Sequence, residues 1–103
     1  MRKRVKYDRD KYLKKKYGIS LKQYNYMLKR QGYKCAICGK HQKDEKRNFA
    51  IDHCHKTGII RGILCNFCNS RLLKHLGDDI PRAKGLVEYL QKWIKKVSKL
   101  GIE

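Results

Sequence analysis

Four of the five cysteines fall into two Cys-x-x-Cys pairs, Cys35/Cys38 and Cys65/Cys68, which are separated by 26 residues. This spacing is typical of structural zinc sites, because a tight turn lets two thiolates three positions apart take two corners of a tetrahedron. Four sulfur ligands leave no open coordination position, so we expect a structural Zn²⁺ that also supplies folding free energy. Four ordinary buried cysteines are the alternative.

The run Asp52-His53-Cys54-His55 lies between the two cysteine pairs, and Asn69 directly follows Cys68. A carboxylate, an amide oxygen and an imidazole around one phosphate would suit hydrolysis of a phosphodiester with Mg²⁺ or Mn²⁺. In a continuous strand, His53 and His55 would share one face and Asp52 would lie on the other, so a common site requires the chain to turn near Asp52.

Each of these residues also has a structural interpretation. Asp52 could be a hydrogen-bonding group at a strand end, His53 a core histidine, His55 a packing or capping residue, and Asn69 a helix N-cap. The catalytic interpretation is favoured because all four fall in one zinc-closed segment. For Cys54, the role of a small buried hydrophobic residue is favoured over a redox or ligand role.

The charge of the chain indicates a polyanionic partner. It has 27 Lys and Arg against 9 Asp and Glu, a net charge of +18, and residues 1–34 hold 13 basic and 2 acidic side chains. Nucleic acid is therefore the expected partner, and an anionic membrane surface is the alternative. No segment is apolar enough to span a membrane, and the basic N-terminus lacks the apolar run of a secretory signal. Paired cysteines that bind a metal indicate a reducing compartment, so we expect a cytoplasmic protein.

Capping residues and apolar spacing predict the elements that must position these groups. Asp8 and the Ser20/Gln23 capping box begin two helices, Gly18 ends the first, and Asp79 begins the last. The middle of the chain is predicted to form a ββα unit with a cysteine pair on each side of the hairpin. The expected order is: helix 8–17, helix 20–31, cysteine knuckle 35–39, polar loop 40–48, strand 49–51, turn 56–58, strand 59–64, helix 65–76 and helix 80–100.

Several other residues have two interpretations. Arg61 could bind a phosphate bidentately or be a solvated surface residue. The Lys14-Lys15-Lys16 run favours phosphate contact because the charge around it is so high. Six tyrosines favour packing between the two N-terminal helices over a base-stacking platform. They are Tyr7, Tyr12, Tyr17, Tyr24, Tyr26 and Tyr33.

The segment from Asp52 to Asn69, preceded by Cys35-Ala36-Ile37-Cys38, resembles the recombination endonuclease VII family of HNH, or ββα-metal, nucleases. The resemblance covers about residues 20–76. It implies Cys35, Cys38, Cys65 and Cys68 as zinc ligands, Asp52 and Asn69 as ligands of a catalytic Mg²⁺ or Mn²⁺, His53 as general base, and His55 near the phosphate or leaving group. It also implies a bacteriophage origin. The best-known member of the family resolves branched DNA as a dimer, so the resemblance suggests branched DNA as a substrate and a homodimer.

Together these observations predict a small α+β protein with a zinc-stapled ββα-metal core flanked by N-terminal helices and a C-terminal helix. We expect one domain, 1–103, with a basic helical DNA-binding part (1–34), a catalytic core (35–76) and a C-terminal helix (79–100). The predicted function is a metal-dependent DNA endonuclease. The alternative is a zinc-containing nucleic-acid-binding protein without catalysis, which would need neither the Asp52-His53 pair nor Asn69.

Overall fold

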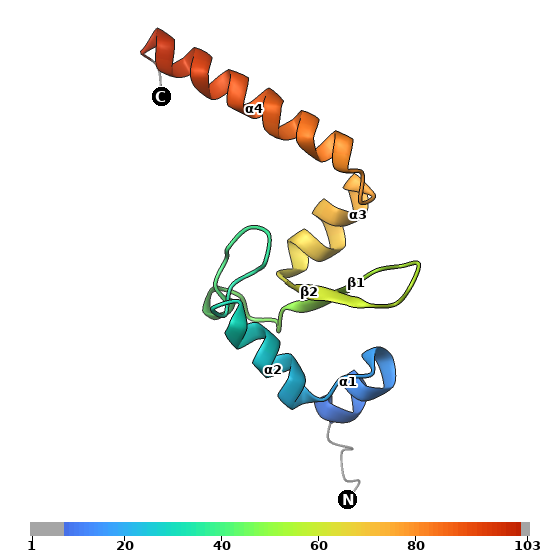
Figure 1. The fold of residues 1–103 in the computed structure, drawn as a ribbon. Helices are drawn as coiled ribbons and strands as arrows, with labels where there is room; N and C mark the ends of the chain where they lie inside the picture. The colour runs from blue at the N-terminus through green and yellow to red at the C-terminus, as the bar shows by residue number, and fades with distance from the viewer. Residues whose placement is uncertain (1–7, 102–103) are drawn as a thin grey trace, which may run out of the picture. The chain divides into compact units, whose positions relative to one another are not determined.

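The computed structural model describes residues 8–101, with the backbone alone at residue 100. The chain forms two compact units, residues 1–69 and 70–103. The order of elements is α1 (Arg9–Tyr17), α2 (Leu21–Arg30), the 3₁₀ turn η1 (Gln42–Asp44), β1 (Ala50–His53), β2 (Ile60–Leu64), the π-helical segment η2 (Cys68–Leu72), α3 (Leu73–Leu76) and α4 (Ile80–Leu100) (Figure 1). The predicted α+β class is confirmed. The boundaries proposed for a single domain stay a prediction.

Local capping fixes the two N-terminal helices. Asp8 accepts a hydrogen bond from the Lys11 amide and Gly18 ends α1 in the left-handed conformation, at φ 74°. Ser20 and Gln23 form the predicted capping box of α2. Asp10 in α1 accepts a hydrogen bond from the Leu21 amide at 2.8 Å, so an acceptor from α1 satisfies one of the free N–H groups at the start of α2.

The core of the first unit lies between these helices and the hairpin. Its most buried side chains come from α1, α2, the entry to β1, and β2. The Tyr24 hydroxyl donates a 2.6 Å hydrogen bond to the Phe49 carbonyl, which joins α2 to the start of β1. The buried apolar side chains, cysteines apart, are Leu13, Tyr24, Leu28, Phe49, Ile51, Ile63 and Leu64.

Strands β1 and β2 form a two-stranded antiparallel sheet whose register shifts next to Asp52. Asp52 pairs with Gly62, but His53 pairs with Ile60, so Arg61 is the extra residue of a β-bulge. The first strand was predicted to end at Ile51; it continues through His53. A common site required the chain to turn near Asp52; the irregularity found there is a bulge in β2, opposite Asp52 and His53, while β1 itself continues through both residues.

The side chain of Gln31, at the C-terminal cap of α2, forms hydrogen bonds with the outer edge of β2, where a third strand would otherwise pair. Its side-chain oxygen accepts from the Ile63 amide at 3.0 Å, and its side-chain nitrogen donates to the carbonyls of Ile63 and Lys34 at 2.8 and 2.9 Å. Ile63 is fully buried, so its backbone groups lack water as an alternative partner.

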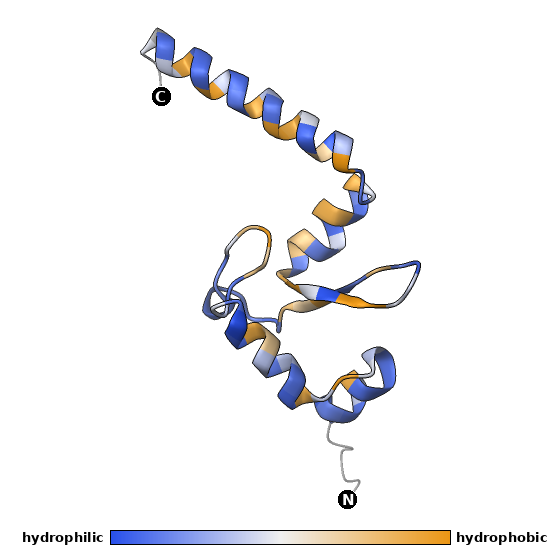
Figure 2. Cartoon of the chain, in the orientation of Figure 1, coloured by the Kyte–Doolittle hydropathy of each residue, from blue (hydrophilic) through white to orange (hydrophobic). Residues whose placement is uncertain are grey.

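The second unit consists mainly of helical residues. The helix that follows Cys65 was predicted as one α-helix; it contains the π-helical segment η2 before α3, which ends at Gly77 in the left-handed conformation. Helix α4 begins at the predicted Asp79 cap and carries apolar residues along one face, seen as alternating colours in Figure 2. None of the described helices is both long and apolar enough to cross a membrane.

We predict that Gln31→Ala lowers the free energy of unfolding of the zinc-loaded protein by about 1–3 kcal/mol, because it leaves the buried Ile63 N–H without a partner and the Ile63 carbonyl with the Ala36 amide alone. Urea unfolding followed by circular dichroism measures this. Gln91→Ala, on the exposed surface of α4, is the matched control and should change stability little. Equal stability of the two variants would contradict the role of Gln31.

Candidate functional site

The two cysteine pairs meet at one point of the first unit. Cys35 and Cys38 lie in the turn after α2, Cys65 follows β2, and Cys68 begins η2. The four sulfur atoms lie within 4.8 Å of one another, and Cys38 Sγ is 3.7 Å from Cys65 Sγ. A Zn–S bond of about 2.3 Å gives a tetrahedron edge of about 3.8 Å. The cluster therefore has the size of a zinc site, and it is the one predicted from spacing.

The thiols are held in an environment that suits a cation. Burial acts to raise the pKa of Cys35, but hydrogen bonds from backbone N–H groups, among them those of Cys38 and Ile37, outweigh it and lower this pKa to about 6. Burial and the neighbouring sulfurs raise the pKa of both Cys65 and Cys68. One thiolate thus forms readily, whereas further thiolates need a positive ion among them.

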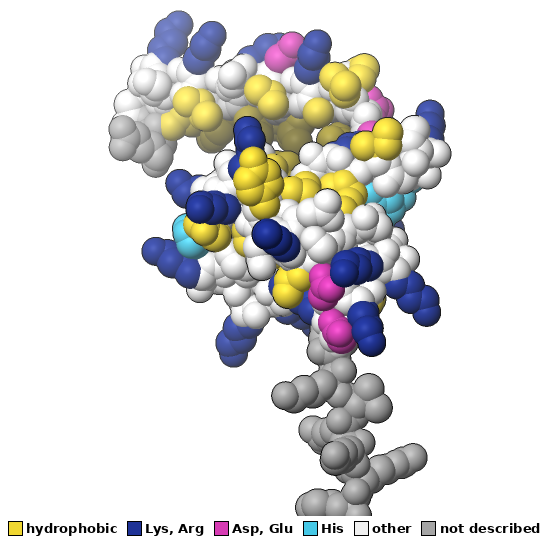
Figure 3. All heavy atoms as spheres, turned by 60° about the horizontal axis from the view of Figure 1, so that its bottom comes forward, with side chains coloured by type: hydrophobic (Ala, Val, Ile, Leu, Met, Phe, Trp, Pro, Cys, Tyr) yellow, Lys and Arg dark blue, Asp and Glu magenta, His cyan; other side chains and the backbone are white. Residues whose placement is uncertain are grey.

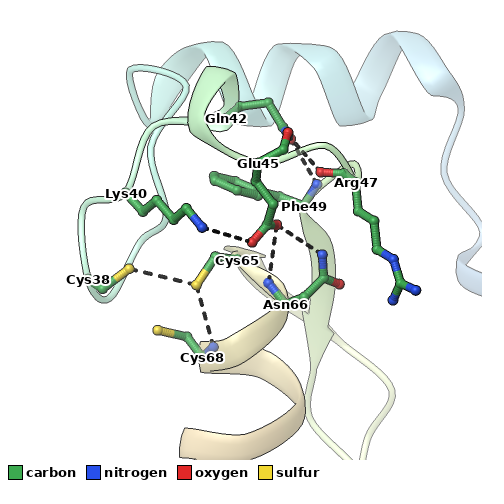
Figure 4. A network of polar contacts seen from close by, with 9 residues as sticks. All are labelled: Cys38, Lys40, Gln42, Glu45, Arg47, Phe49, Cys65, Asn66 and Cys68. Atoms are coloured by element: carbon green, nitrogen blue, oxygen red, sulfur yellow. Dashed lines mark hydrogen bonds and ion pairs between the residues drawn. The ribbon is translucent and has the colours of Figure 1, made fainter.

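A polar network supports the cluster from the loop before β1 (Figure 4). Glu45 accepts hydrogen bonds from the Asn66 side chain at 2.9 Å and from the Asn66 amide at 3.5 Å, and it pairs with Lys40 at 3.4 Å. The Gln42 side chain binds the carbonyl of Arg47 and the amide of Phe49, both at 2.8 Å. We expected only a polar loop here. The signal in the sequence was an acidic residue, Glu45, between the two cysteine pairs. Its carboxylate binds the N-terminal end of the helix that follows Cys65.

Asp52 is buried, with 8% of its surface exposed, and it is held by Arg61. The Arg61 Nε and Nη2 groups donate to the two carboxylate oxygens at 2.7 and 3.1 Å. Such a two-bond pair neutralises a buried carboxylate effectively. Arg61 is therefore not a solvated surface residue without a partner, as one interpretation had it, because the bulge brings it next to Asp52; phosphate contact by Arg61 stays a prediction.

His53 and His55 lie close together at the end of β1. Their ring centroids are 4.9 Å apart, and the ring of Tyr17 from α1 is 6.0 Å from that of His53. His53 is half-buried and His55 is exposed. Within residues 8–101, neither imidazole makes a hydrogen bond. A half-buried and an exposed imidazole next to each other at the end of a strand can accept a proton from a bound water.

Asn69 lies within η2 and is half-buried. Its amide donates to the Cys65 carbonyl at 3.1 Å, as in a helix. Its side chain makes no hydrogen bond with Asp52 or His53 in the described part of the chain. Among residues 8–101, the four cysteines are the one group of three or more His, Cys, Asp or Glu side chains close enough to hold a metal. The structure thus brings Asp52, His53 and His55 to one end of the hairpin, and the expected part of Asn69 stays a proposal.

Cys54 is half-buried and does not join the zinc cluster. The Thr57 hydroxyl, together with backbone N–H groups of Thr57 and Lys56, donates to its sulfur and lowers the pKa of this thiol. The favoured interpretation as a buried hydrophobic residue was therefore wrong. The turn that closes the hairpin presents donors to this sulfur.

The predicted packing role of the tyrosines holds for Tyr24 and fails for most of the others. Tyr24 is 2% exposed, whereas Tyr12, Tyr26 and Tyr33 are 41%, 59% and 45% exposed. Tyr17 is half-buried, and Tyr7 lies outside the described residues. Helix α1 buries a single side chain, Leu13, so it has no apolar face that could enclose several aromatic rings.

Basic side chains cover the surface of both units (Figure 3). Lys14, Lys15 and Lys16 are exposed on α1, as phosphate contact requires. One of these lysines, Lys14, already forms an ion pair with Asp10 of the same helix at 3.0 Å. Lys and Arg visibly outnumber Asp and Glu in this view, in keeping with the net charge of +18.

We predict that Cys35→Ser or Cys65→Ser abolishes stoichiometric zinc binding and lowers the melting temperature severely, since the metal links the turn after α2 to the hairpin. Zinc content by atomic absorption and thermal unfolding by circular dichroism measure both effects. Cys54→Ser is the matched control and should retain one zinc per chain. Full zinc content in the Cys35 and Cys65 variants would refute the four-sulfur site.

Comparison with known proteins identifies the family. The "Gene 59 protein" of Mycobacterium phage D29 is 40% identical over 76 residues, covering 74% of this chain and 46% of the relative. The protein of the same name from Mycobacterium phage L5 is 40% identical over 74 residues, covering 72% of this chain and 44% of the relative. The chain thus spans less than half the length of these curated relatives. No solved structure matches the sequence. Residues 10–92 match the family described as recombination endonuclease VII, and together with the cysteine cluster inside that range this match means that the chain belongs to the recombination endonuclease VII family.

Proposed function

We propose that this chain is a metal-dependent endonuclease of the HNH, or ββα-metal, type that hydrolyses phosphodiester bonds in DNA. One observation carries the proposal: Asp52 and His53 are consecutive residues at the bulged end of β1, in a hairpin joined to a four-sulfur cluster. A buried carboxylate beside an accessible imidazole supplies a metal ligand and a base within reach of one phosphate. The family to which the chain belongs supports the same chemistry.

His53 is the proposed general base. It takes a proton from a water molecule, whose oxygen forms a bond to the scissile phosphorus while the bond from phosphorus to the leaving oxygen breaks. His55, whose ring lies 4.9 Å from that of His53, is proposed to lie near the phosphate or leaving group. Because His55 is exposed, a DNA strand can reach it without opening the core.

Asp52 and Asn69 are the proposed holders of a catalytic Mg²⁺ or Mn²⁺. One carboxylate and one amide oxygen are hard ligands of low total charge, which suits an ion that keeps most of its waters. When bound, such an ion supplies positive charge at the scissile phosphate and the leaving oxygen. In the structure, Arg61 neutralises Asp52, so at least one carboxylate oxygen must be released from Arg61 before a metal can use it.

The cationic surface supports DNA as the partner. Lys14, Lys15 and Lys16 are exposed on α1, and Tyr17 at the end of the same helix is next to His53. A DNA backbone held along α1 would therefore approach the proposed base. A membrane is not a proposed partner.

The resemblance extends the proposal to branched or nicked DNA, to a homodimer, and to action in the cytoplasm of a bacterial host. Cleavage of a synthetic four-way junction compared with a linear duplex of the same sequence tests the first. Sedimentation equilibrium with and without DNA tests the second.

A nucleic-acid-binding protein without catalysis is the second candidate. The Asp52–Arg61 pair favours it, because a carboxylate whose two oxygens are both engaged could serve structure alone. The two candidates differ in what loss of His53 does. A protein that only binds DNA would keep its function without His53, whereas a nuclease would lose DNA cleavage.

We predict that His53→Ala lowers the rate of plasmid cleavage by about 10²–10⁴-fold while DNA affinity is retained, because only the proton acceptor is removed. Strand scission on gels with added Mg²⁺ or Mn²⁺ measures the rate, and fluorescence anisotropy measures affinity. His75→Ala, an exposed histidine of α3, is the control and should cleave like the wild type. Cleavage by His53→Ala at the wild-type rate would refute the assignment.

We further predict that Arg61→Gln binds Mn²⁺ several-fold more tightly than the wild type in the absence of DNA, since the cation that competes for Asp52 is gone. Calorimetry measures the affinity, and Mn²⁺ should raise the melting temperature of Arg61→Gln more than that of the wild type. Arg82→Gln is the control, because Arg82 faces Asp79 at 3.9 Å on the exposed end of α4. Weaker Mn²⁺ binding by Arg61→Gln would show that Arg61 orients Asp52 and does not compete for it.

A further inference from the structure

A pocket of about 310 Å³ lies between α1, α2 and the start of β1. Its floor is apolar and buried, formed by Leu13, Phe49 and Ile51 together with the ring of Tyr24. The hydroxyl of Tyr24 is already used by the Phe49 carbonyl, and these floor side chains are only 2–4% exposed, so most of the accessible lining comes from polar groups nearer the mouth. This volume is at the lower end of the range for ligand pockets, about 300–1,000 Å³, and admits one aromatic ring system.

The mouth of the pocket carries aromatic and polar groups. Tyr12 is 41% exposed and Tyr17 is half-buried, while Arg9 and Asn48 supply hydrogen-bond donors at the rim. The Arg9 guanidinium lies 4.3 Å from the centroid of the Tyr24 ring. No carboxylate lines the pocket. The lining therefore suits a flat aromatic ring that is part of a negatively charged molecule.

A cation next to the pocket strengthens this preference. Lys16 Nζ lies 3.1 Å from the Tyr12 hydroxyl and 5.5 and 5.4 Å from the ring centroids of Tyr12 and Tyr17. Lys16 is exposed and belongs to the Lys14-Lys15-Lys16 run. An ammonium group at this rim can hold a phosphate while a ring attached to the same backbone enters the pocket.

The pocket adjoins the proposed catalytic residues. Tyr17 forms part of its wall, and the ring of Tyr17 is 6.0 Å from that of His53. Ile51 at the floor comes two residues before His53 in β1. If a phosphate of DNA lies at His53, the base of that nucleotide, or the base of the adjacent nucleotide, can thus reach the pocket.

We propose that this pocket binds a single nucleobase of a DNA strand, one that lies outside the base stack, next to the phosphate at His53. The proposal rests on the proposed function, because it takes His53 as the position of the scissile phosphate. Tyr12 and Tyr17 stack on the base, and Arg9 and Asn48 reach its polar edge. The exposed tyrosines that the core cannot enclose are thereby given a role in substrate choice.

Three DNA duplexes of equal sequence test the pocket: one fully paired, one with an extra unpaired adenine, and one with an extra abasic nucleotide at the same position. Affinity is measured by fluorescence anisotropy without added Mg²⁺ or Mn²⁺, so that no strand is cut. The wild type should bind the unpaired-base duplex about tenfold more tightly than the abasic one, since the abasic duplex lacks the base that the pocket would hold.

Tyr12→Leu should reduce this ratio toward one and change the affinity for the fully paired duplex little. Arg9→Gln should also reduce the ratio, and because it removes a positive charge from α1 it should weaken binding of all three duplexes. Tyr26→Leu is the matched control, because Tyr26 is a more exposed tyrosine that also faces an arginine, Arg30, and it should keep the wild-type ratio. Zinc content and circular dichroism check that each variant is folded.

A wild-type ratio of one, or a ratio that survives in both pocket variants, would overturn the proposal. These outcomes are independent of cleavage. A failure of the proposed nuclease activity would instead appear as intact binding of all three duplexes with no scission when Mg²⁺ is present.

Discussion

The first unit depends on the attraction between four clustered thiol groups and a divalent cation. The cluster joins the turn after α2, the end of β2 and the start of η2. Without a cation, the sulfurs oppose one another's ionisation, and burial raises the pKa of Cys68 and Cys65. With one, deprotonation, metal binding and closure of the hairpin become a single event. The network of Glu45 and Asn66 then holds the loop before β1 against the same point.

Local signals explain how much of the fold could be predicted. The caps at Asp8, Ser20 and Asp79 were predicted and observed, because a cap depends on residues within one turn of the chain. The cysteine cluster was predicted for the same kind of reason, since two turns of fixed geometry each present two sulfurs. The end of β1 and the π-helical segment were missed. Both depend on pairing or packing with distant residues, which hydrophobic spacing does not encode.

The candidate site was predicted as a set of residues but not as a set of contacts. Asp52, His53 and His55 lie within four positions of the sequence, so their closeness in space needs no tertiary contact. Their partners do not: Arg61 reaches Asp52 through a bulge, and Tyr17 reaches His53 from α1. Gln31 and Glu45 were missed because a polar side chain that binds a distant backbone or helix end looks like any surface residue. Similarly, the tyrosines looked like core residues because aromatic content does not reveal how little of α1 is buried.

The position of Arg61 matters more than its charge alone. A buried carboxylate needs a neutralising partner, and a partner deep in the core could be exchanged only by opening the core. Arg61 instead lies on a bulge, with 37% of its side chain exposed, while 11% of the Asp52 side chain is exposed. The guanidinium can therefore swing toward solvent, or toward a phosphate, while the strands, the cysteine cluster and the backbone contacts of Gln31 stay in place. For the proposed role of Asp52 as a metal ligand, this arrangement means that Arg61 would neutralise the carboxylate in the absence of the metal and could be displaced when the metal binds.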